Sequence, residues 1–268
     1  MNEYRTVVQA HAGPSLSPGI VPIPYVFEEG CRTTMVYPKF TIDFFEFIDI
    51  YARHHRRMGC SERIARVWLA QMLQSLSVCT EQNIVHRDLK LENLLMDERG
   101  NCVIADFELA LWNKKATEGG FTDNVDVVGT PMYIPPEVIV DRRVHVAKND
   151  MWSVGVVAWE MVSNSNPWRV DPDSISLHRL LETTKKTTKG SFKKEEHMSD
   201  EMFEFVTCCV CPVEERLTPT EAMKLDFFKG ISFDSNDLFP RDEALDDLEE
   251  VKEMLVVYGN RMGGKWGR

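Results

Sequence analysis

Two consecutive helical stripes limit what this 268-residue chain can fold into more than any other feature of its sequence. The first stripe is predicted to begin at Thr41, and its apolar residues recur at helical spacing: Ile42, Phe44, Phe45, Phe47, Ile48 and Tyr51. The second follows Ser61, a suitable N-cap, with apolar residues at intervals of three and four: Ile64, Val67, Trp68, Met72 and Leu76. Both patterns are typical of helices that bury one face in a core.

Segments rich in β-branched and aromatic residues lie on both sides of these helices. Residues 20–40 predict two short strands joined by a turn at residues 28–30. Residues 92–107 predict further short strands around a tight turn at residues 98–101. We expect these strands to form a small sheet.

The rest of the chain is predicted to be mostly helical. Residues 150–162 form an apolar stretch, and Thr218 opens a capping box with proline at the first helical position. The polar segment 182–196 predicts a surface loop, and residues 231–268 an acidic tail with an amphipathic stretch at 245–257. With 43% apolar residues, the chain can form one core or two lobes across a cleft. The predicted fold class is α+β, with a small sheet on a larger helical body.

Charge and hydropathy argue against two kinds of partner. The 31 basic and 42 acidic residues give a net charge of −11, which would repel a phosphate backbone, so we expect no nucleic-acid partner. The sequence has no apolar run near the ~20 residues that cross a bilayer, so we expect no membrane partner. The N-terminus lacks the apolar centre of a secretory signal, which favours an intracellular, cytoplasmic location.

The cysteines predict neither a disulfide framework nor a zinc site. There are seven, an odd number, and in a reducing compartment we expect free thiols. Cys208, Cys209 and Cys211 lie in an apolar segment without a second cysteine or histidine pair at zinc spacing. This setting favours buried thiols over metal ligands.

The string that carries most chemistry spans residues 86–95 and reads HRDLKLENLL. It resembles the catalytic loop of protein kinases. Phosphoryl transfer needs a carboxylate that orients the attacking hydroxyl, a cation near the transferred group and oxygen ligands for magnesium. The resemblance implies that Asp88 is the base, Lys90 the transition-state cation and Asn93 a magnesium ligand, with His86 and Arg87 in structural or regulatory roles.

A second segment is similar to the Asp-Phe-Gly motif of the same family. Asp106 and Phe107 follow Asn93 at the spacing that the family shows, which implies that Asp106 binds magnesium and that Phe107 is structural. Glu108 stands where the family has glycine, a residue that tolerates positive φ. We expect Glu108 to add a third carboxylate beside the metal.

Two further segments match the family in order and separation. Residues 129–137 resemble the segment that ends in Ala-Pro-Glu, with proline in place of alanine. In the family this glutamate pairs with a distant arginine, which implies an ion pair between Glu137 and Arg216. Residues 150–155 resemble the buried helix whose aspartate, here Asp150, holds the backbone of the catalytic loop.

Substrate preference follows from the same resemblance. Lys90 and Thr130 mark serine/threonine kinases within the family, and Thr130 is expected to hydrogen-bond toward Asp88 and Lys90. Glu92 lies where some kinases read an arginine of the substrate, and the alternative is an ordinary solvated glutamate. A basic peptide would suit the net charge of the chain.

Regulation is suggested by Arg87, which precedes the base as in kinases whose activation segment is ordered by a phosphothreonine. This sequence has Asp126 near the position where many relatives carry that threonine. We expect Asp126 to replace the phosphate and pair with Arg87, and the alternative is an ordinary exposed aspartate.

The region before the catalytic loop lacks two features of the family's small lobe. It has a single lysine, Lys39, and no Gly-x-Gly-x-x-Gly string, so neither the phosphate-binding lysine nor the glycine-rich loop is found. Glu3 lies where the family's helix glutamate is expected. We interpret the chain as an incomplete copy of a longer kinase, or as one that another segment or a partner completes.

Nucleotide contacts are implied for four residues. Met35 and Tyr37 belong to a segment that resembles the hinge, Leu95 would lie under adenine, and Asp106 would reach the phosphates through the metal. Pro38 is expected to remove one hinge N–H donor, because proline has no amide hydrogen.

The sequence therefore predicts a serine/threonine protein kinase that transfers the γ-phosphate of ATP to a protein hydroxyl, with Mg²⁺ as cofactor. The alternative is a catalytically impaired pseudokinase or truncated kinase that acts as a binding scaffold. The predicted organisation is a partial small lobe over residues 1–37, a large lobe over 38–230 and an acidic tail over 231–268. The expected partners are a protein or peptide substrate, for which we favour basic character, and a completing or activating protein.

Overall fold

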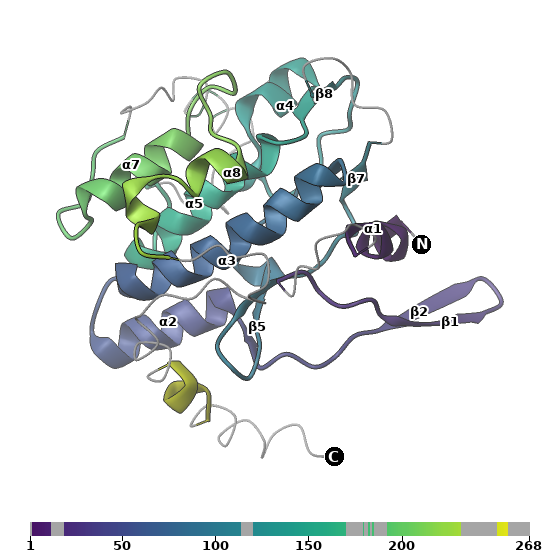
Figure 1. Ribbon diagram of the computed structural model, residues 1–268, viewed down its shortest axis with the longest axis horizontal. Coiled ribbons are helices and arrows are strands. Elements are labelled where there is room, and N and C mark those ends of the chain that lie inside the picture. The colour runs from purple at the N-terminus through teal and green to yellow at the C-terminus, as the bar shows by residue number, and fades with distance from the viewer. Residues whose placement is uncertain are drawn as a thin grey trace.

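The computed structural model shows a largely helical body from which a β-hairpin projects (Figure 1). It describes residues 2–11, 19–113, 120–169, 179, 182, 184, 192–231 and 251–256. The labelled helices, strands and 3₁₀ turns (η) are α1 Asn2–Ala10, β1 Tyr25–Glu29, β2 Arg32–Val36, β3 Ile42–Asp43, α2 Phe44–His55, α3 Glu62–Glu81, β4 Ile84–Val85, η1 Leu91–Asn93, β5 Leu94–Met96, β6 Cys102–Ile104, β7 Leu111–Trp112, β8 Phe121–Thr122, η2 Pro131–Tyr133, α4 Pro136–Asp141, β9 Val144–His145, α5 Asn149–Ser163, α7 Asp200–Cys209, α8 Pro219–Ala222 and η3 Asp226–Phe228.

The core lies among α2, α3, α5 and α7. α5 packs against both α3 and α7, and α3 also contacts α8. The large side chains of Trp68, Trp152 and Trp159 are fully buried there. Gly155 allows α5 and α7 to approach closely, because a Cβ at this position would lie 2.6 Å from Cγ2 of Val210. The predicted apolar helix at 150–162 is therefore confirmed, and it is the central helix of the body.

The first predicted helix begins later than its pattern suggested. Residues Ile42–Asp43 form β3, in which Ile42 pairs with Met96 of β5. Asp43 is the N-cap of α2, and its Oδ1 accepts a hydrogen bond from Glu46 N at 2.8 Å. The predicted start at Thr41 was wrong because Ile42 and Asp43 pair with β5 as a strand and the helix begins only after them. Phe45 was also wrongly placed in the buried face, since it is 59% exposed.

The second predicted helix is confirmed as α3, whose N-cap Ser61 accepts a hydrogen bond from Ile64 N. The predicted strands after it are confirmed as β5 and β6, which form a three-stranded antiparallel sheet with β3. In the turn between them, Gly100 has a φ of 83° and its carbonyl accepts a hydrogen bond from Trp68 Nε1 at 2.8 Å. This bond ties the sheet to the helical body.

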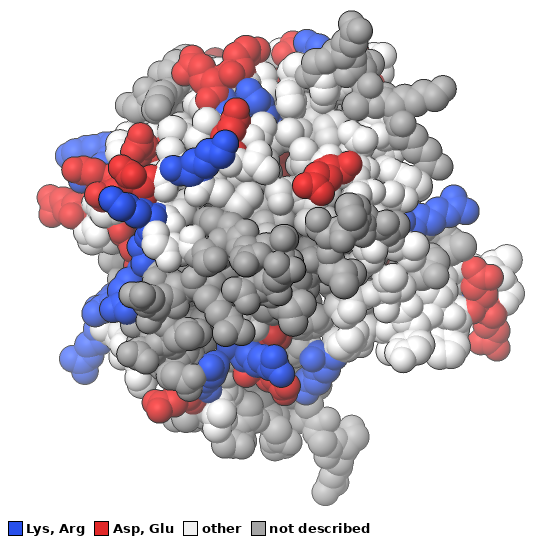
Figure 2. Space-filling model, viewed as in Figure 1, with Lys and Arg blue, Asp and Glu red and all other residues white. Residues whose placement is uncertain are grey.

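The predicted hairpin at residues 20–40 is confirmed as β1 and β2, paired antiparallel from Tyr25 and Val36 to Glu29 and Arg32. It extends away from the helices, and the side chains of Tyr25 and Phe27 are largely exposed (Figure 1). Figure 2 shows acidic and basic side chains interspersed over the visible face, with acidic ones on the projecting hairpin.

The later segments contain one confirmation and one correction. Thr218 forms the predicted capping box, with Thr218 N donating to Glu221 Oε2 at 2.8 Å, although α8 has only four residues. The predicted surface loop at 182–196 lies largely outside the described residues. Where the structure describes it, Thr184 is helical and buried, and Phe192 packs edge-on against Trp159 at 5.5 Å. The loop prediction was wrong at residues 182 and 184, which are helical, and it was confirmed at residues 192–196, which form no helix or strand and are exposed or half-buried.

Part of the acidic tail also packs against the body. Residues 251–256 are helical, and Val251 and Leu255 are buried in the main core.

All seven cysteines are free thiols, and Cys31 alone among them is exposed. Within the described ranges, no helix combines the length and hydropathy of a membrane span. The same residues contain no group of three or more His, Cys, Asp or Glu side chains that could hold a metal.

Candidate active site

Four donors surround the carboxylate of Asp88. Thr130 donates from its amide and its hydroxyl to Oδ1, at 2.8 and 2.9 Å. On the other oxygen, Asn93 Nδ2 lies 3.1 Å and Lys90 Nζ 3.2 Å from Oδ2. The Asp88 side chain is only 10% exposed, so these contacts hold it in one orientation. A fixed carboxylate of this kind can accept a proton from a bound hydroxyl.

Thr130 joins Lys90 to Asp88. Its Oγ1 accepts a hydrogen bond from Lys90 Nζ at 2.9 Å while its hydroxyl hydrogen goes to Asp88. The preceding Gly129 has a φ of 103°, and a Cβ there would lie 2.4 Å from the carbonyl oxygen of Arg87. Glycine is therefore required for residues 129–130 to lie directly on the catalytic loop.

Asp150, in the first turn of α5, holds the start of the catalytic loop. Its Oδ2 accepts the His86 amide at 2.7 Å and its Oδ1 accepts the Arg87 amide at 3.0 Å. Arg87 has a φ of 69°, in the left-handed region that non-glycine residues rarely adopt. These two hydrogen bonds, one buried and one partly buried, offset the cost of this conformation, so Asp150 fixes the backbone just before Asp88.

Several bonds join the Asp106 segment to the catalytic loop. The Ala105 amide donates to Asn93 O at 2.9 Å, and His86 Nε2 donates to Ala105 O at 2.9 Å. The rings of His86 and Phe107 pack edge-on at 4.7 Å. These contacts fold two segments together and bring Asp106 to the same site as Asn93.

Glu108, which stands at the family's glycine position, does not adopt a positive φ. The positive φ of this segment belongs to Asp106, at 61°, and Glu108 has no such strain. Asp106 Oδ1 accepts the Glu108 amide at 3.3 Å. Glu108 is exposed and is not among the residues that line the pocket, and its role as a third carboxylate beside a metal stays a prediction.

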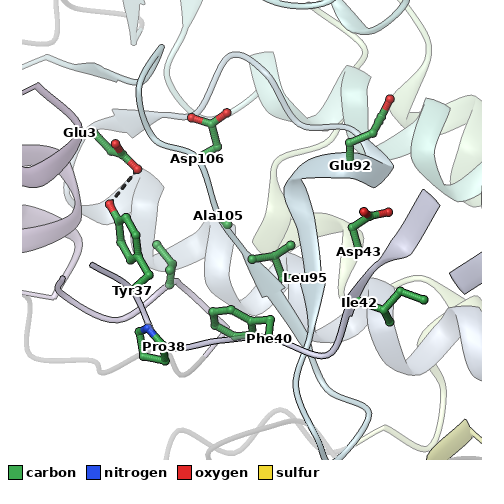
Figure 3. A pocket seen from close by; sticks show the side chains of 11 residues that line it. Glu3, Tyr37, Pro38, Phe40, Ile42, Asp43, Glu92, Leu95, Ala105 and Asp106 are labelled. Carbon is green, nitrogen blue, oxygen red and sulfur yellow. Dashed lines mark hydrogen bonds between the residues drawn. The ribbon is translucent and has the colours of Figure 1, made fainter. Parts of the chain in front are cut away.

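A pocket of about 470 Å³ lies beside these residues (Figure 3). Its lining consists of Glu3, Val21, Tyr37, Pro38, Phe40, Ile42, Asp43, Glu92, Leu95, Ala105 and Asp106. Three of the four residues predicted to contact nucleotide therefore line it: Tyr37, Leu95 and Asp106. Met35 does not, since it lies on β2 outside the lining.

Most of the apolar lining was missed by the sequence analysis. Val21 reaches the pocket because its amide donates to Ile104 O at 2.8 Å, which attaches this segment to β6. Phe40 and Ile42 follow the hairpin, where the chain returns to the body through β3. No local motif marks these residues, because their position depends on pairing between distant segments.

Tyr37 and Glu3 meet across one end of the pocket, as Figure 3 shows. The Tyr37 hydroxyl donates to Glu3 Oε1 at 2.7 Å, which joins the segment after β2 to α1. Burial raises the pKa of Tyr37, and the hydrogen bond to Glu3 and the negative charges of Glu3 and Asp106 raise it further. The predicted position of Glu3 at the site is thus matched by a contact that the sequence did not suggest.

Arg87 is held differently from the arrangement expected with Asp126. Its Nε donates to Leu109 O at 2.7 Å, and burial lowers the pKa of its guanidinium. The charges of Asp150 and, less strongly, Asp126 act in the opposite direction. Asp126 is exposed, so its role as a replacement for phosphate stays a prediction.

Glu137 and Arg216 form a bidentate ion pair at 2.7 and 3.1 Å. The Arg216 side chain is fully buried and also donates to the carbonyls of Cys211 and Lys148. Its guanidinium lies 5.2 Å from the ring of Trp152. The pair fastens α4 to the segment between α7 and α8.

A buried acid that the sequence analysis did not assign lies near Glu92. The Tyr133 hydroxyl donates to Glu160 Oε2 at 2.8 Å, from η2 to α5. Burial raises the pKa of Glu160 to about 8, Tyr133 lowers it, and the charge of Glu92 adds to the increase. An acid within the apolar stretch 151–162 was the available signal, because a carboxylate is costly to bury.

We expect stability to fall as pH rises through the titration of Glu160. Between its ordinary pKa of 4.5 and about 8, the folded protein keeps a proton that the unfolded chain has released. From pH 6 to 8, the wild type should lose on the order of 2 kcal/mol more unfolding free energy than Glu160→Gln. Denaturant titrations at both pH values measure the difference.

Tyr133→Phe serves as the matched comparison. It removes the hydrogen bond that lowers the pKa of Glu160, so the loss of stability should extend to higher pH. A constant difference in unfolding free energy between wild type and Glu160→Gln across this range would contradict the prediction.

Known proteins similar to this chain agree with the site. The family model for the protein kinase domain matches residues 3–228. CBL-interacting serine/threonine-protein kinase 13 of Arabidopsis thaliana is 34% identical over 69% of this chain and 34% of the relative. CBL-interacting serine/threonine-protein kinase 3 of the same organism is 32% identical over 70% of this chain and 41% of the relative. Probable serine/threonine-protein kinase MARK-B of Dictyostelium discoideum is 34% identical over 58% of this chain and 21% of the relative.

The chain belongs to the protein kinase family, since the family match covers most of its length. These relatives are serine/threonine kinases by name, and by family this chain is of the serine/threonine type. It spans less than half the length of each of these three relatives. The predicted α+β fold is confirmed.

Proposed function

We propose that this chain is a serine/threonine kinase that transfers the γ-phosphate of ATP to a protein hydroxyl. The observation that carries the proposal is the arrangement around Asp88, which places a carboxylate, a lysine, an amide and a threonine within hydrogen-bonding distance. Phosphoryl transfer is catalysed mainly by positioning and by charge stabilisation, and these groups supply both.

Each side chain of this arrangement has a distinct role in the proposal. Asp88 orients the attacking hydroxyl and accepts its proton. Lys90 places positive charge beside the transferred group. Thr130 fixes the positions of the Lys90 and Asp88 side chains relative to each other, because its hydroxyl bonds to both. Because Thr130 lies against the carboxylate, the space beside it suits a short aliphatic hydroxyl.

The residues present fit magnesium. Asn93 uses its Nδ2 to donate to the backbone and side chain of Asp88, which leaves its Oδ1 for a cation. The carboxylate of Asp106 lies at the pocket, and carboxylate and amide oxygens are the ligands that magnesium prefers. When bound, the ion would neutralise charge on the phosphates and orient them.

Acidic side chains near the catalytic loop support a basic peptide as substrate. Glu92 is exposed at η1, directly beside Asn93, and its charge acts on Glu160. A substrate arginine placed here would meet two carboxyl groups and would favour the charged form of Glu160. A basic substrate would also be attracted by the net charge of −11.

Transfer of labelled γ-phosphate to a serine peptide tests the function. With Mg²⁺ present, we expect labelling of a peptide that has arginines before the serine, and much weaker labelling of a peptide with glutamates instead. A chelator should abolish both signals. No magnesium-dependent labelling of either peptide would refute kinase activity in this chain and would support the scaffold alternative.

A further inference from the structure

The side chains that line the pocket include several acids, which is unusual for a site that binds a polyphosphate. Four of its lining residues are acidic: Glu3, Asp43, Glu92 and Asp106. No lysine or arginine is among the described residues that line it. A triphosphate in this pocket would therefore meet several negative charges and no side-chain cation of the lining.

The acids lie at both ends of the pocket, with apolar side chains between them. In Figure 3, Glu3 and Asp106 are at one end and Glu92 and Asp43 at the other, while Phe40 and Leu95 lie between. A flat, uncharged ring system can bury its faces against this apolar middle. The phosphates of a nucleotide would have to extend toward one of the acidic ends.

The two lysines that lie close in sequence to lining residues, Lys39 and Lys90, do not offset these acids. Lys90 is engaged by Asp88 and Thr130 at 3.2 and 2.9 Å. Lys39 lies between two lining residues, Pro38 and Phe40, but is exposed and is not part of the lining itself.

Glu3 differs from the other three acids in what holds it. Asp43 caps α2, Asp106 accepts the Glu108 amide, and Glu92 is exposed to solvent. Glu3 is instead directed across the pocket by the hydroxyl of Tyr37 at 2.7 Å. A neutral donor fixes the position of this carboxylate but does not neutralise its charge.

We propose that Glu3 makes this pocket select against negative charge, so that it binds an uncharged nucleoside more tightly than the nucleoside triphosphate at equal magnesium concentration. The proposal rests on the proposed function, because it assumes that the same pocket takes the nucleotide. It adds that triphosphate binding depends on cations from solution, and that one acid of α1 sets the preference.

Titration calorimetry with adenosine, AMP and ATP at one magnesium concentration tests the preference. In the wild type we expect affinity to decrease in that order, as phosphates are added. Glu3→Gln keeps an acceptor for Tyr37 but removes the charge. It should raise the affinity for ATP about tenfold, as expected for one partly screened charge contact, and change that for adenosine by less than about twofold.

Two further variants test whether the effect comes from the charge of Glu3 or from a change in the shape of the pocket. Glu204→Gln removes the same charge from an exposed position on α7 and should leave all three affinities unchanged. Tyr37→Phe removes the hydroxyl but keeps the charge of Glu3, so adenosine should still bind more tightly than ATP. Circular dichroism of each variant checks that it is folded.

The proposal is overturned if the wild type binds ATP at least as tightly as adenosine, or if none of the three ligands binds. It is also overturned if Glu3→Gln alters the affinities for ATP and adenosine equally. Failure of the proposed function would look different, since phosphate transfer would be absent while the order of affinities remained as stated.

Discussion

Replacing Asp88 with asparagine is expected to lower the rate of phosphate transfer by about 10²- to 10⁴-fold, the range for losing a positioned general base. The asparagine amide cannot accept the proton of the attacking hydroxyl. In wild type, Lys90 and Asn93 both donate hydrogens to Oδ2 of Asp88. If the NH₂ group of the asparagine took the place of Oδ2, it would face these two donors and could not accept from them. The loss should therefore appear mainly in kcat, with the binding of adenosine retained.

Rates of transfer to the arginine-containing peptide, measured with purified wild type and variant, check this prediction. Asp123→Asn is the matched control, since it neutralises an exposed aspartate on the segment before Thr130, where Asp123 pairs with Arg143. Its rate should remain within about twofold of wild type, as expected for an exposed ion pair. Equal rates for Asp88→Asn and wild type would exclude Asp88 as the base.

Replacing Arg216 with alanine is expected to cost about 3 to 5 kcal/mol of unfolding free energy. The change leaves the carboxylate of Glu137 without its bidentate partner. It also removes the donors that reach the carbonyls of Cys211 and Lys148. Since the Arg216 side chain is fully buried, water cannot replace these bonds without opening the contact between α4 and the segment before α8.

Thermal and denaturant unfolding measure the loss, and a decrease in Tm of about 10 °C is expected for a chain of this size. Arg143→Ala is the control, because Arg143 pairs with Asp123 at the surface with side chains 47% and 54% exposed. That variant should lose no more than about 1 kcal/mol. If the two variants were equally stable, the buried pair would not be a fastening point of the fold.

The sequence allowed the catalytic loop to be predicted because its chemistry is local. Asp88, Lys90 and Asn93 lie within six consecutive residues, and one turn of chain brings them together. Asp150 and Thr130 were predicted only through the family resemblance, since they are distant in sequence. The structure shows the hydrogen bonds by which these two residues hold the loop.

The pocket was harder to predict, because its lining residues come from segments that are distant in sequence. Val21, Phe40 and Ile42 carry no motif, and they become neighbours through the pairing of β3 with β5 and of residue 20 with residue 104. The error in the start of α2 has the same origin. A helical pattern extends over Ile42, but a strand partner from residue 96 competes for it.

By itself, the sequence determined the helical stripes of the body and the groups available for phosphoryl transfer, because periodicity and close spacing act within one segment. Tertiary structure alone decided that Tyr37 meets Glu3, that Tyr133 meets Glu160, and that the pocket beside the catalytic loop has four acids in its lining. These are contacts between side chains far apart in the chain. Their geometry, and the pKa changes that follow, depend on how the elements pack and exclude water.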